Sequence, residues 1–413
     1  MGYWKQKQIE EFDRGFKYLG EKFVCDDCIG NDYIKNYIKE YASHKFCSYC
    51  DRNEDINISV HLEEVLEIIM DGIKAEYDDP RNCMGFEGGW QGAKTYDTFD
   101  LMDIYGYELG IEDDKLREDI IDSMIDDEWC EISPYSQREN EMYFSNWAEF
   151  CEIVKHKMRY MFLIKQLNRR EIFKTSNETL IIQKKVNPTI NDFSEILFYI
   201  EDNIKEIDII KEIEEGSIFY RGRTHGADER YYNASDIGTP PIGAAIYSNR
   251  MSPAGIPMFY GGMDIDTVYE EMKKDNKPCV TIGNFISIVP FTIIDFTKLP
   301  PIPTVFNPDT RHLRQPLMFF EDFIKDLSKP VTKDGREHIE YIPTQIITEY
   351  IRHIFKHYDD NNIDGIFYPS ACKVGGICCV LFLENKDCTD NKSEKNKKLL
   401  LTHTSVRKYQ MNE

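Results

Sequence analysis

The sequence predicts an α+β protein with a mostly helical N-terminal part and a C-terminal part built on a mixed sheet. Apolar residues recur at helical spacing through the first half, whereas short β-rich runs alternate with turn clusters from Ser217 onward. At 413 residues the chain exceeds the usual size of a single core. We therefore predict three domains, at residues 1–58, 59–190 and 191–413.

Composition narrows the classes of partner. The net charge of −23 disfavours a nucleic-acid binder, because such proteins need basic faces that release counterions. No apolar run approaches the roughly 20 residues of a membrane span. The N-terminus lacks the apolar region of a secretory signal, and Gln6 stands where a myristoylation motif has Ser or Thr. We expect a cytoplasmic protein with no membrane partner.

The first module contains four closely spaced cysteines, Cys25, Cys28, Cys47 and Cys50. Two CxxC pairs of soft thiolates can close a tetrahedron around zinc, and four protein ligands leave no open position for catalysis. We therefore predict a structural zinc, with His44 as an alternative ligand. A DNA-reading zinc ribbon is the functional alternative, and the aspartates beside these cysteines oppose it.

Helical periodicity predicts most of the elements before Ser217. Ser59 is expected to cap the second of these helices, and Ser145 the fourth. A polar, basic connector is expected near residues 166–190. The predicted helices cover residues 29–46, 59–77, 113–129, 145–164 and 190–210.

The C-terminal part combines short strands with two helical stretches. The tail from Asn385 is interpreted as an appendage, although LLLTH, residues 399–403, is a candidate for a final short strand. The helix in DIDTVYEEM is expected to be capped by Asp264 or Asp266. The predicted strands are SIFYRGR (217–223), PMFYGG (257–262), CVTIGNFI (279–286), TIIDFT (292–297) and CCVLFLE (378–384).

The strand FYRGR, residues 219–223, predicts an anion-binding site. Arg221 and Arg223 are two residues apart, so both guanidinium groups leave one face of the strand. Two such groups form a bidentate clamp for a pyrophosphate. The alternative is a salt bridge to a nearby carboxylate.

The stretch NRMSPAGIPMFYGGMDIDTVYEEM, residues 249–272, holds an aromatic residue and a carboxylate eleven positions apart. Its Pro and Gly residues set a turn that delivers Tyr260 into a strand, and a helix follows with Glu270 and Glu271. A carboxylate facing an aromatic ring suits a sugar attached to a flat base. The alternative is a core tyrosine beside a solvated helix face. Ser370 lies in a later turn, where it can donate to a ligand oxygen.

These blocks resemble the RES domain, whose name records Arg, Glu and Ser. FYRGR, RMSPAGIPMFYGG, a helix that ends in EEM, and FYPSA followed by GG and a VLF strand carry the resemblance over residues 215–385. The run YIPTQIITEYIRHIF, residues 341–355, resembles the late helix of the family. The N-terminal part is similar to the HEPN-like domains that precede some RES domains. Its VKHKMRYMF segment departs from the arginine-then-histidine order of HEPN ribonucleases.

The resemblance implies an ADP-ribosyltransferase-like fold and an NAD-consuming activity. RES proteins degrade NAD by phosphorolysis, hydrolysis or ADP-ribosyl transfer, and antitoxins often neutralise them. The implied catalytic residues are Arg221, Tyr260, Glu271 and Ser370, with Glu270 as a neighbouring candidate. Arg221, Arg223, Arg250 and Tyr260 are the implied residues that bind NAD.

The acceptor remains open between inorganic phosphate and water. Phosphate needs a basic subsite, for which Arg223, Arg250 and Arg311 are available. The expected biological role is that of a toxin or antiphage-defence effector with an antitoxin or regulatory partner. The alternatives are a transferase that modifies a protein target and a non-enzymatic, zinc-stapled adaptor. The adaptor predicts no loss of NAD.

Overall fold

The computed structural model describes residues 3–126, 128–159, 193–273, 277–331, 335–356 and 362–408. The chain forms two compact units. The first contains residues 1–141 together with Pro301–Pro316, and the second contains Met142–Pro300 and Leu317–Glu413. The predicted connector at 166–190 lies outside the described residues. Every helix within the described ranges is too short or too polar to span a bilayer.

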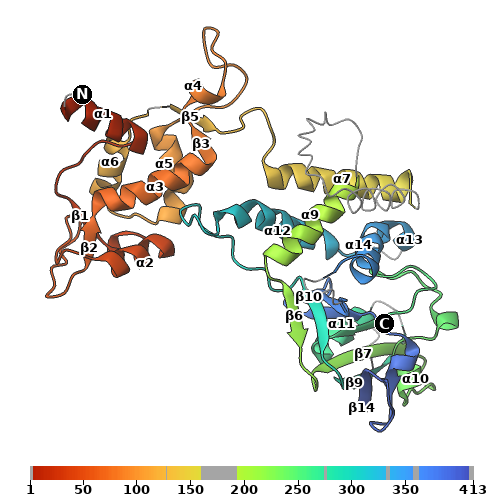
Figure 1. The fold of residues 1–413 in the computed structure, drawn as a ribbon. Coiled ribbons are helices and arrows are strands. Elements are labelled where there is room, and N and C mark those ends of the chain that lie inside the picture. Colours follow the sequence, from red (N-terminus) through yellow and green to blue (C-terminus); the bar gives the residue numbers. More distant parts are fainter. Residues whose placement is uncertain are drawn as a thin grey trace, which may run out of the picture. The chain divides into compact units, whose positions relative to one another are not determined.

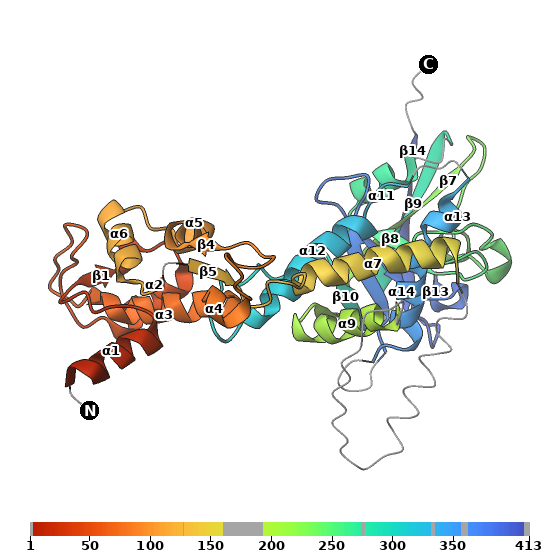
Figure 2. The same cartoon turned by 90° about the horizontal axis from the view of Figure 1, so that it is seen from above.

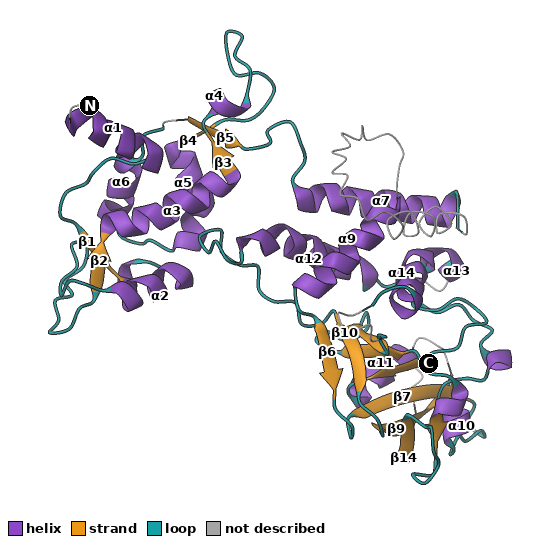
Figure 3. Ribbon diagram, viewed as in Figure 1, coloured by secondary structure: helices purple, strands orange, loops and turns teal. Residues whose placement is uncertain are grey.

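The first unit is mainly helical, with short strands between the helices (Figure 3). The helix predicted between the cysteine pairs is present as α2. The helices are α1 (Tyr3–Arg14), α2 (Asp32–Tyr41), α3 (Leu62–Glu76), α4 (Pro80–Cys83), α5 (Thr98–Leu109) and α6 (Asp114–Ser123). The strands are β1 (Phe23–Cys25), β2 (Ser59–His61), β3 (Tyr77–Asp78), β4 (Tyr96–Asp97) and β5 (Glu128–Glu131).

Two predicted helix caps are wrong. Ser59 lies in β2, where it pairs with Cys25 of β1, and α3 begins only at Leu62. Ser145 lies inside α7 (Glu139–His156), which begins six residues earlier than its expected cap. Both serines therefore lie within regular structure, although each favours a cap when its local sequence alone is considered.

A segment that is distant in sequence completes the core of the first unit. Val305 and Phe306, from Pro301–Pro316, are fully buried among the apolar residues of the first unit. Phe306 lies so close to Gly72 of α3 that a Cβ there would meet the ring at 2.5 Å. Arg314 forms an ion pair with Glu108 at 2.7 Å. The sequence analysis did not predict this insertion.

The second unit is built on a mixed sheet, as predicted, and this sheet has nine strands within the described residues. The strand order is β13-β14-β9-β7-β8-β12-β11-β10-β6, with β10–β11 and β13–β14 parallel and the other pairs antiparallel. The strands are β6 (Ile210–Ile213), β7 (Ile218–His225), β8 (Phe259–Gly262), β9 (Cys279–Ser287), β10 (Phe291–Asp295), β11 (Gly365–Pro369), β12 (Ile377–Leu381), β13 (Cys388–Thr389) and β14 (Leu399–Lys408).

Helices flank this sheet. Figures 1 and 2 both show α9, α12 and α14 beside one another and near β10. A ring contact joins α9 and α12, because the ring centroids of Tyr199 and Phe319 lie 5.2 Å apart. The helices are α9 (Phe193–Glu206), α10 (Ala234–Ile237), α11 (Ile265–Met272), α12 (Arg314–Leu327), α13 (Glu337–Glu340) and α14 (Ile342–His353).

The C-terminal tail is part of the sheet and not an appendage. β14 pairs with β9 from Leu399 opposite Ser287 to Lys408 opposite Cys279. The candidate strand LLLTH is therefore present, and it continues for five residues beyond His403. This strand places β9 inside the sheet, next to β7, which carries Arg221 and Arg223.

The two units differ in charge. The first contains 17 Lys and Arg against 36 Asp and Glu, a net charge of −19, and the second contains 33 against 37, a net charge of −4. The acidity that disfavours polyanion binding is therefore concentrated in the first unit. The sheet-based unit is nearly neutral overall, so a few arginines can make a local site attractive to an anion.

Candidate active site and metal centre

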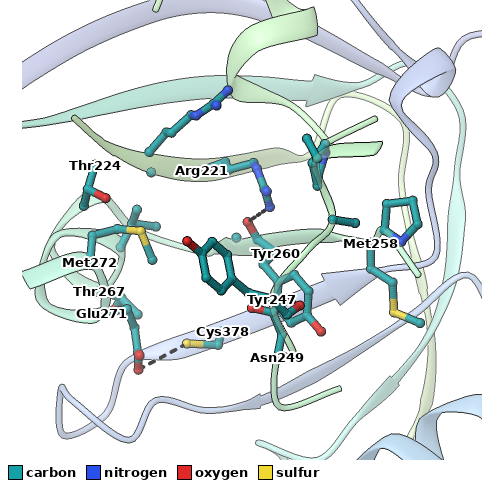
Figure 4. A pocket seen from close by; sticks show the side chains of 18 of the residues that line it. Arg221, Thr224, Tyr247, Asn249, Met258, Tyr260, Thr267, Glu271, Met272 and Cys378 are labelled. Atoms are coloured by element: carbon teal, nitrogen blue, oxygen red, sulfur yellow. Dashed lines mark hydrogen bonds between the residues drawn. The ribbon is translucent and has the colours of Figure 1, made fainter. Parts of the chain in front are cut away.

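A cavity of about 370 Å³ opens in the second unit (Figure 4). Strands β7 and β8, the loop before β8, helix α11 and strands β11 and β12 contribute its walls. Of the predicted site residues, Arg221, Arg223, Tyr260 and Glu271 line it together. Its other lining residues are Gly222, Thr224, Pro240, Ala244, Ala245, Tyr247, Asn249, Ile256, Pro257, Met258, Gly261, Thr267, Val268, Met272, Tyr368 and Cys378.

Arg221 is held in place by the neighbouring strand. Its Nη1 donates to the carbonyl oxygen of Tyr260 at 2.6 Å, and its guanidinium lies 5.3 Å from the ring centroid of Phe259. Burial lowers the pKa of Arg221 to about 10. Because this pKa remains well above neutrality, Arg221 presents a positive charge inside the cavity.

Arg223 occupies a more exposed part of the same strand. Its guanidinium lies 4.3 Å from the ring centroid of Tyr231, and its Nη1 donates to the carbonyl oxygen of Asp236. Gly222, between the two arginines, lets α11 approach β7, because a Cβ there would meet Met272 at 2.6 Å. The glycine of FYRGR therefore brings the arginine strand against the helix that carries Glu271.

Tyr260 is fixed through its hydroxyl group. Ser252, which is fully buried, shares a hydrogen bond of 2.9 Å with this hydroxyl. Burial is the main cause that raises the pKa of Tyr260, so the side chain is a neutral phenol at physiological pH. Gly255 has a φ of +91°, which favours glycine and closes the predicted turn ahead of β8.

Helix α14 anchors this turn, a role that the sequence analysis missed. Gln345 is buried and donates through Nε2 to Ser248 Oγ at 2.8 Å and to the carbonyl oxygen of Asn249 at 2.7 Å. Thr344 donates to the carbonyl oxygen of Arg250. The signal was the presence of polar Thr and Gln residues on an otherwise apolar helix face.

Glu271 lies in the last turn of α11. Of the two candidate caps, Asp264 is the one that caps the helix, because it accepts from the backbone N–H of Thr267 at 2.8 Å. The Oε1 atom of Glu271 accepts from Ser370 Oγ at 2.5 Å and contacts Cys378 Sγ at 3.7 Å. Two donors therefore meet the same carboxylate oxygen. The second oxygen, Oε2, is the one that remains for a ligand in the cavity.

Ser370 contacts the carboxylate of Glu271 through a hydrogen bond. Its Oγ also accepts from the backbone N–H groups of Cys372 at 3.1 Å and Lys373 at 3.2 Å. A serine hydroxyl has one hydrogen to donate and two lone pairs, so these three bonds fill its capacity. Ser370 therefore orients the carboxylate, and binding a substrate atom directly would cost it one of these bonds.

Three other predicted residues lie elsewhere. Arg250 donates to the carbonyl oxygens of Leu327 and Lys329 near the end of α12, and it does not line the cavity. Arg311 belongs to the first unit, where it pairs with Asp71 at 2.7 Å. Glu270 forms an ion pair with Lys273, in which Oε2 and Nζ lie 3.7 Å apart.

Tyr368 and Cys378 are among the cavity residues that the sequence analysis missed. Tyr368 of β11 and Cys378 of β12 both line the cavity, and burial raises the pKa of each. Cys378 is therefore a neutral thiol that can donate to Glu271. A CC pair in an apolar strand looks like ordinary core, so no local signal distinguishes this thiol.

The four N-terminal cysteines converge in the first unit. Their ligand atoms all lie within 4.8 Å of one another, and neighbouring sulfurs are separated by 3.6–3.7 Å. Zinc–sulfur bonds of about 2.3 Å place the corners of a tetrahedron about 3.8 Å apart. All four thiols are free, and these separations are far longer than a disulfide bond. The donor set and spacing fit a tetrahedral metal, whereas the His44 ring packs on Phe23 at 3.9 Å.

Purified protein is expected to contain about one zinc ion per chain, because four sulfurs satisfy a structural site. Replacing Cys47 with serine should remove most of this metal and destabilise the first unit. Elemental analysis of the purified proteins measures the metal content. Cys83→Ser is the matched control, since Cys83 lies in the same unit outside the cluster. A Cys47 variant that retains a full zinc complement would contradict the assignment.

The cavity joins two guanidinium groups, a phenol and an oriented carboxylate. This combination can bind a ligand that has both anionic and hydroxyl-bearing parts. Family models match two parts of the chain. The HEPN/RES N-terminal domain 1 matches residues 40–168, and the RES domain matches residues 219–402. The chain therefore carries a RES domain after a HEPN/RES N-terminal domain. RES domains are associated with NAD-acting enzymes and with toxin or effector proteins. Comparisons with curated proteins and with solved structures gave no match.

Proposed function

We propose that the chain cleaves the bond between nicotinamide and ribose in NAD. The observation that supports this most is the oriented carboxylate of Glu271 in the same cavity as Arg221 and Tyr260. When this bond breaks, nicotinamide leaves with the bonding electron pair and C1′ of the ribose becomes positively charged. A carboxylate that interacts more strongly with this cation than with ground-state NAD lowers the barrier.

The predicted site residues have distinct proposed roles. Arg221, with Arg223 beside it, binds the pyrophosphate. Tyr260 contacts the nicotinamide end. Glu271 holds the ribose hydroxyl groups through Oε2 and stabilises the cation, while Ser370 fixes the orientation of that carboxylate. Arg250 serves the site indirectly, by tying the turn that contains Ser252 to the end of α12.

The acceptor is proposed to be inorganic phosphate or water. Either forms a new C1′–O bond on the cationic sugar and releases a proton. Of the three arginines considered for a phosphate subsite, only Arg223 lines the cavity. Arg250 contacts the carbonyl oxygen of Leu327, and Arg311 pairs with Asp71. The biological role that we propose is that of a toxin or antiphage effector, restrained by an antitoxin or another regulatory partner.

Incubation of the chain with NAD is expected to release nicotinamide. Mass spectrometry of the products, with and without added phosphate, identifies the acceptor: ADP-ribose indicates water, and its 1″-phosphate indicates phosphate. A labelled protein with little free ADP-ribose would indicate the transferase alternative. Intact NAD after incubation under all of these conditions would contradict the proposed function and favour the non-enzymatic adaptor.

A further inference from the structure

The loop before β8 contains exposed apolar residues, and one of them lines the cavity. Ile242, Ile246 and Tyr247 are 72%, 65% and 76% exposed. Tyr247 also lines the cavity, so one face of this side chain belongs to the binding site although most of it meets solvent. The other lining aromatics, Tyr260 and Tyr368, are partly buried. A large exposed ring at a cavity edge is a surface that a ligand can cover.

The backbone around Tyr247 is held firmly. The N–H of Gly255 donates to the carbonyl oxygen of Ala245 at 2.7 Å, and Asn249 Nδ2 donates to the carbonyl oxygen of Tyr247 at 3.3 Å. Gln345 adds its bond to Ser248 Oγ at 2.8 Å. These hydrogen bonds fix the backbone of the loop that carries the Tyr247 ring. The loop therefore loses less conformational entropy when a ligand binds.

The size of the cavity indicates what reaches Tyr247. A volume of about 370 Å³ lies near the lower end of the range of about 300–1,000 Å³ for pockets that enclose one drug-sized ligand. A dinucleotide has two bases and two sugars, so part of it must extend outside. Because Glu271 acts on the ribose that bears nicotinamide, the part that extends outside is the adenosine half. This step rests on the proposed function.

We infer that Tyr247 is the stacking platform for the second base of the dinucleotide, an adenine. Aromatic side chains stack on bases with little dependence on base identity, and such stacking accounts for a substantial share of nucleotide affinity. Arg221 and Arg223 hold the phosphates, and Tyr247 holds the base that follows them. Tyr247 is therefore a residue that favours dinucleotides over phosphates without a base.

Calorimetric titration with ADP and with inorganic pyrophosphate tests this inference without requiring turnover. ADP carries the adenine and both phosphates, whereas pyrophosphate carries only the phosphates. Tyr247→Ala is expected to raise the Kd of ADP about tenfold or more and to leave that of pyrophosphate unchanged. Tyr247→Trp should retain ADP binding, because it preserves the aromatic face. Tyr232→Ala is the matched control, since Tyr232 is 64% exposed and does not line the cavity.

Three results would overturn the inference: equal weakening of ADP and pyrophosphate binding, unchanged ADP binding in Tyr247→Ala, or no ADP binding by the parent chain. The second result, with Ile242 and Tyr247 still exposed, would favour a docking surface for another protein. The proposed function fails in a different way, through intact NAD after incubation with the parent chain. ADP binding that depends on Tyr247 can be measured whether or not NAD is consumed.

Discussion

Replacing Glu271 with glutamine is expected to slow NAD consumption by about 10²–10³-fold, the usual cost of one preorganised electrostatic contact. The geometry explains the size of the effect. Ser370 and Cys378 both direct donors at Oε1, so the amide oxygen must take that place. The amide NH₂ then replaces Oε2 in the cavity. The neutral NH₂ group cannot stabilise the positive charge that develops on the ribose, whereas the negative Oε2 can.

The matched control is Glu270→Gln. Glu270 is adjacent in sequence, but its carboxylate lies near Lys273. The Glu270→Gln variant should therefore consume NAD at close to the parent rate. Initial rates of nicotinamide release at saturating NAD measure both variants. Loss of activity in Glu270→Gln with retention in Glu271→Gln would move the catalytic role by one residue. Parent rates in both would remove the carboxylate from the mechanism.

Phe306→Ala is expected to lower the free energy of unfolding of the first unit by about 3–5 kcal/mol, the usual cost of removing a buried aromatic ring. Phe306 is fully buried, packs against Gly72 of α3, and lies 5.7 Å from the Tyr105 ring of α5. Loss of the ring leaves a cavity between two helices that cannot close without moving both backbones.

Hydrogen exchange separates this effect from changes in the second unit. The amides of α3 and α5 should exchange much faster in Phe306→Ala, while those of β7 and β9 should keep their parent rates. Phe99→Ala is the control, because Phe99 lies on α5 with 62% of its surface exposed and its loss should change stability by less than about 0.5 kcal/mol. Unchanged protection of α3 in Phe306→Ala would show that this segment does not support the first unit.

Local sequence patterns predicted much of the fold because the relevant signals lie within a few residues. Alternating apolar residues and turn clusters located β7, β8, β9, β10 and β12, and Asp264, one of two candidate caps, is the N-cap of α11. Ser59 misled the prediction, because its pairing with Cys25 comes from a strand 34 positions away. Pairing between distant segments overrides a cap preference, which is worth only about 1 kcal/mol.

In the candidate site too, local features were predicted from the sequence and contacts between distant segments were not. The two-residue spacing of Arg221 and Arg223, and the turn that delivers Tyr260, are properties of short segments, and all three residues line the cavity. The bond from Ser370 to Glu271 joins residues 99 positions apart, and the anchoring of the turn by Gln345 is of similar span. Such contacts depend on how the sheet is assembled, and no single segment encodes them.

The position of Pro301–Pro316 has a consequence for modular ancestry. This stretch lies within the span matched by the RES family, yet its side chains complete the interior of the N-terminal unit. If the gene were cut between the two family matches, the N-terminal fragment would lack part of its hydrophobic core. The C-terminal fragment would carry Val305 and Phe306 without the core that buries them. Recombination could transfer this pair intact far more easily than it could exchange either half, so the two halves are expected to be inherited together.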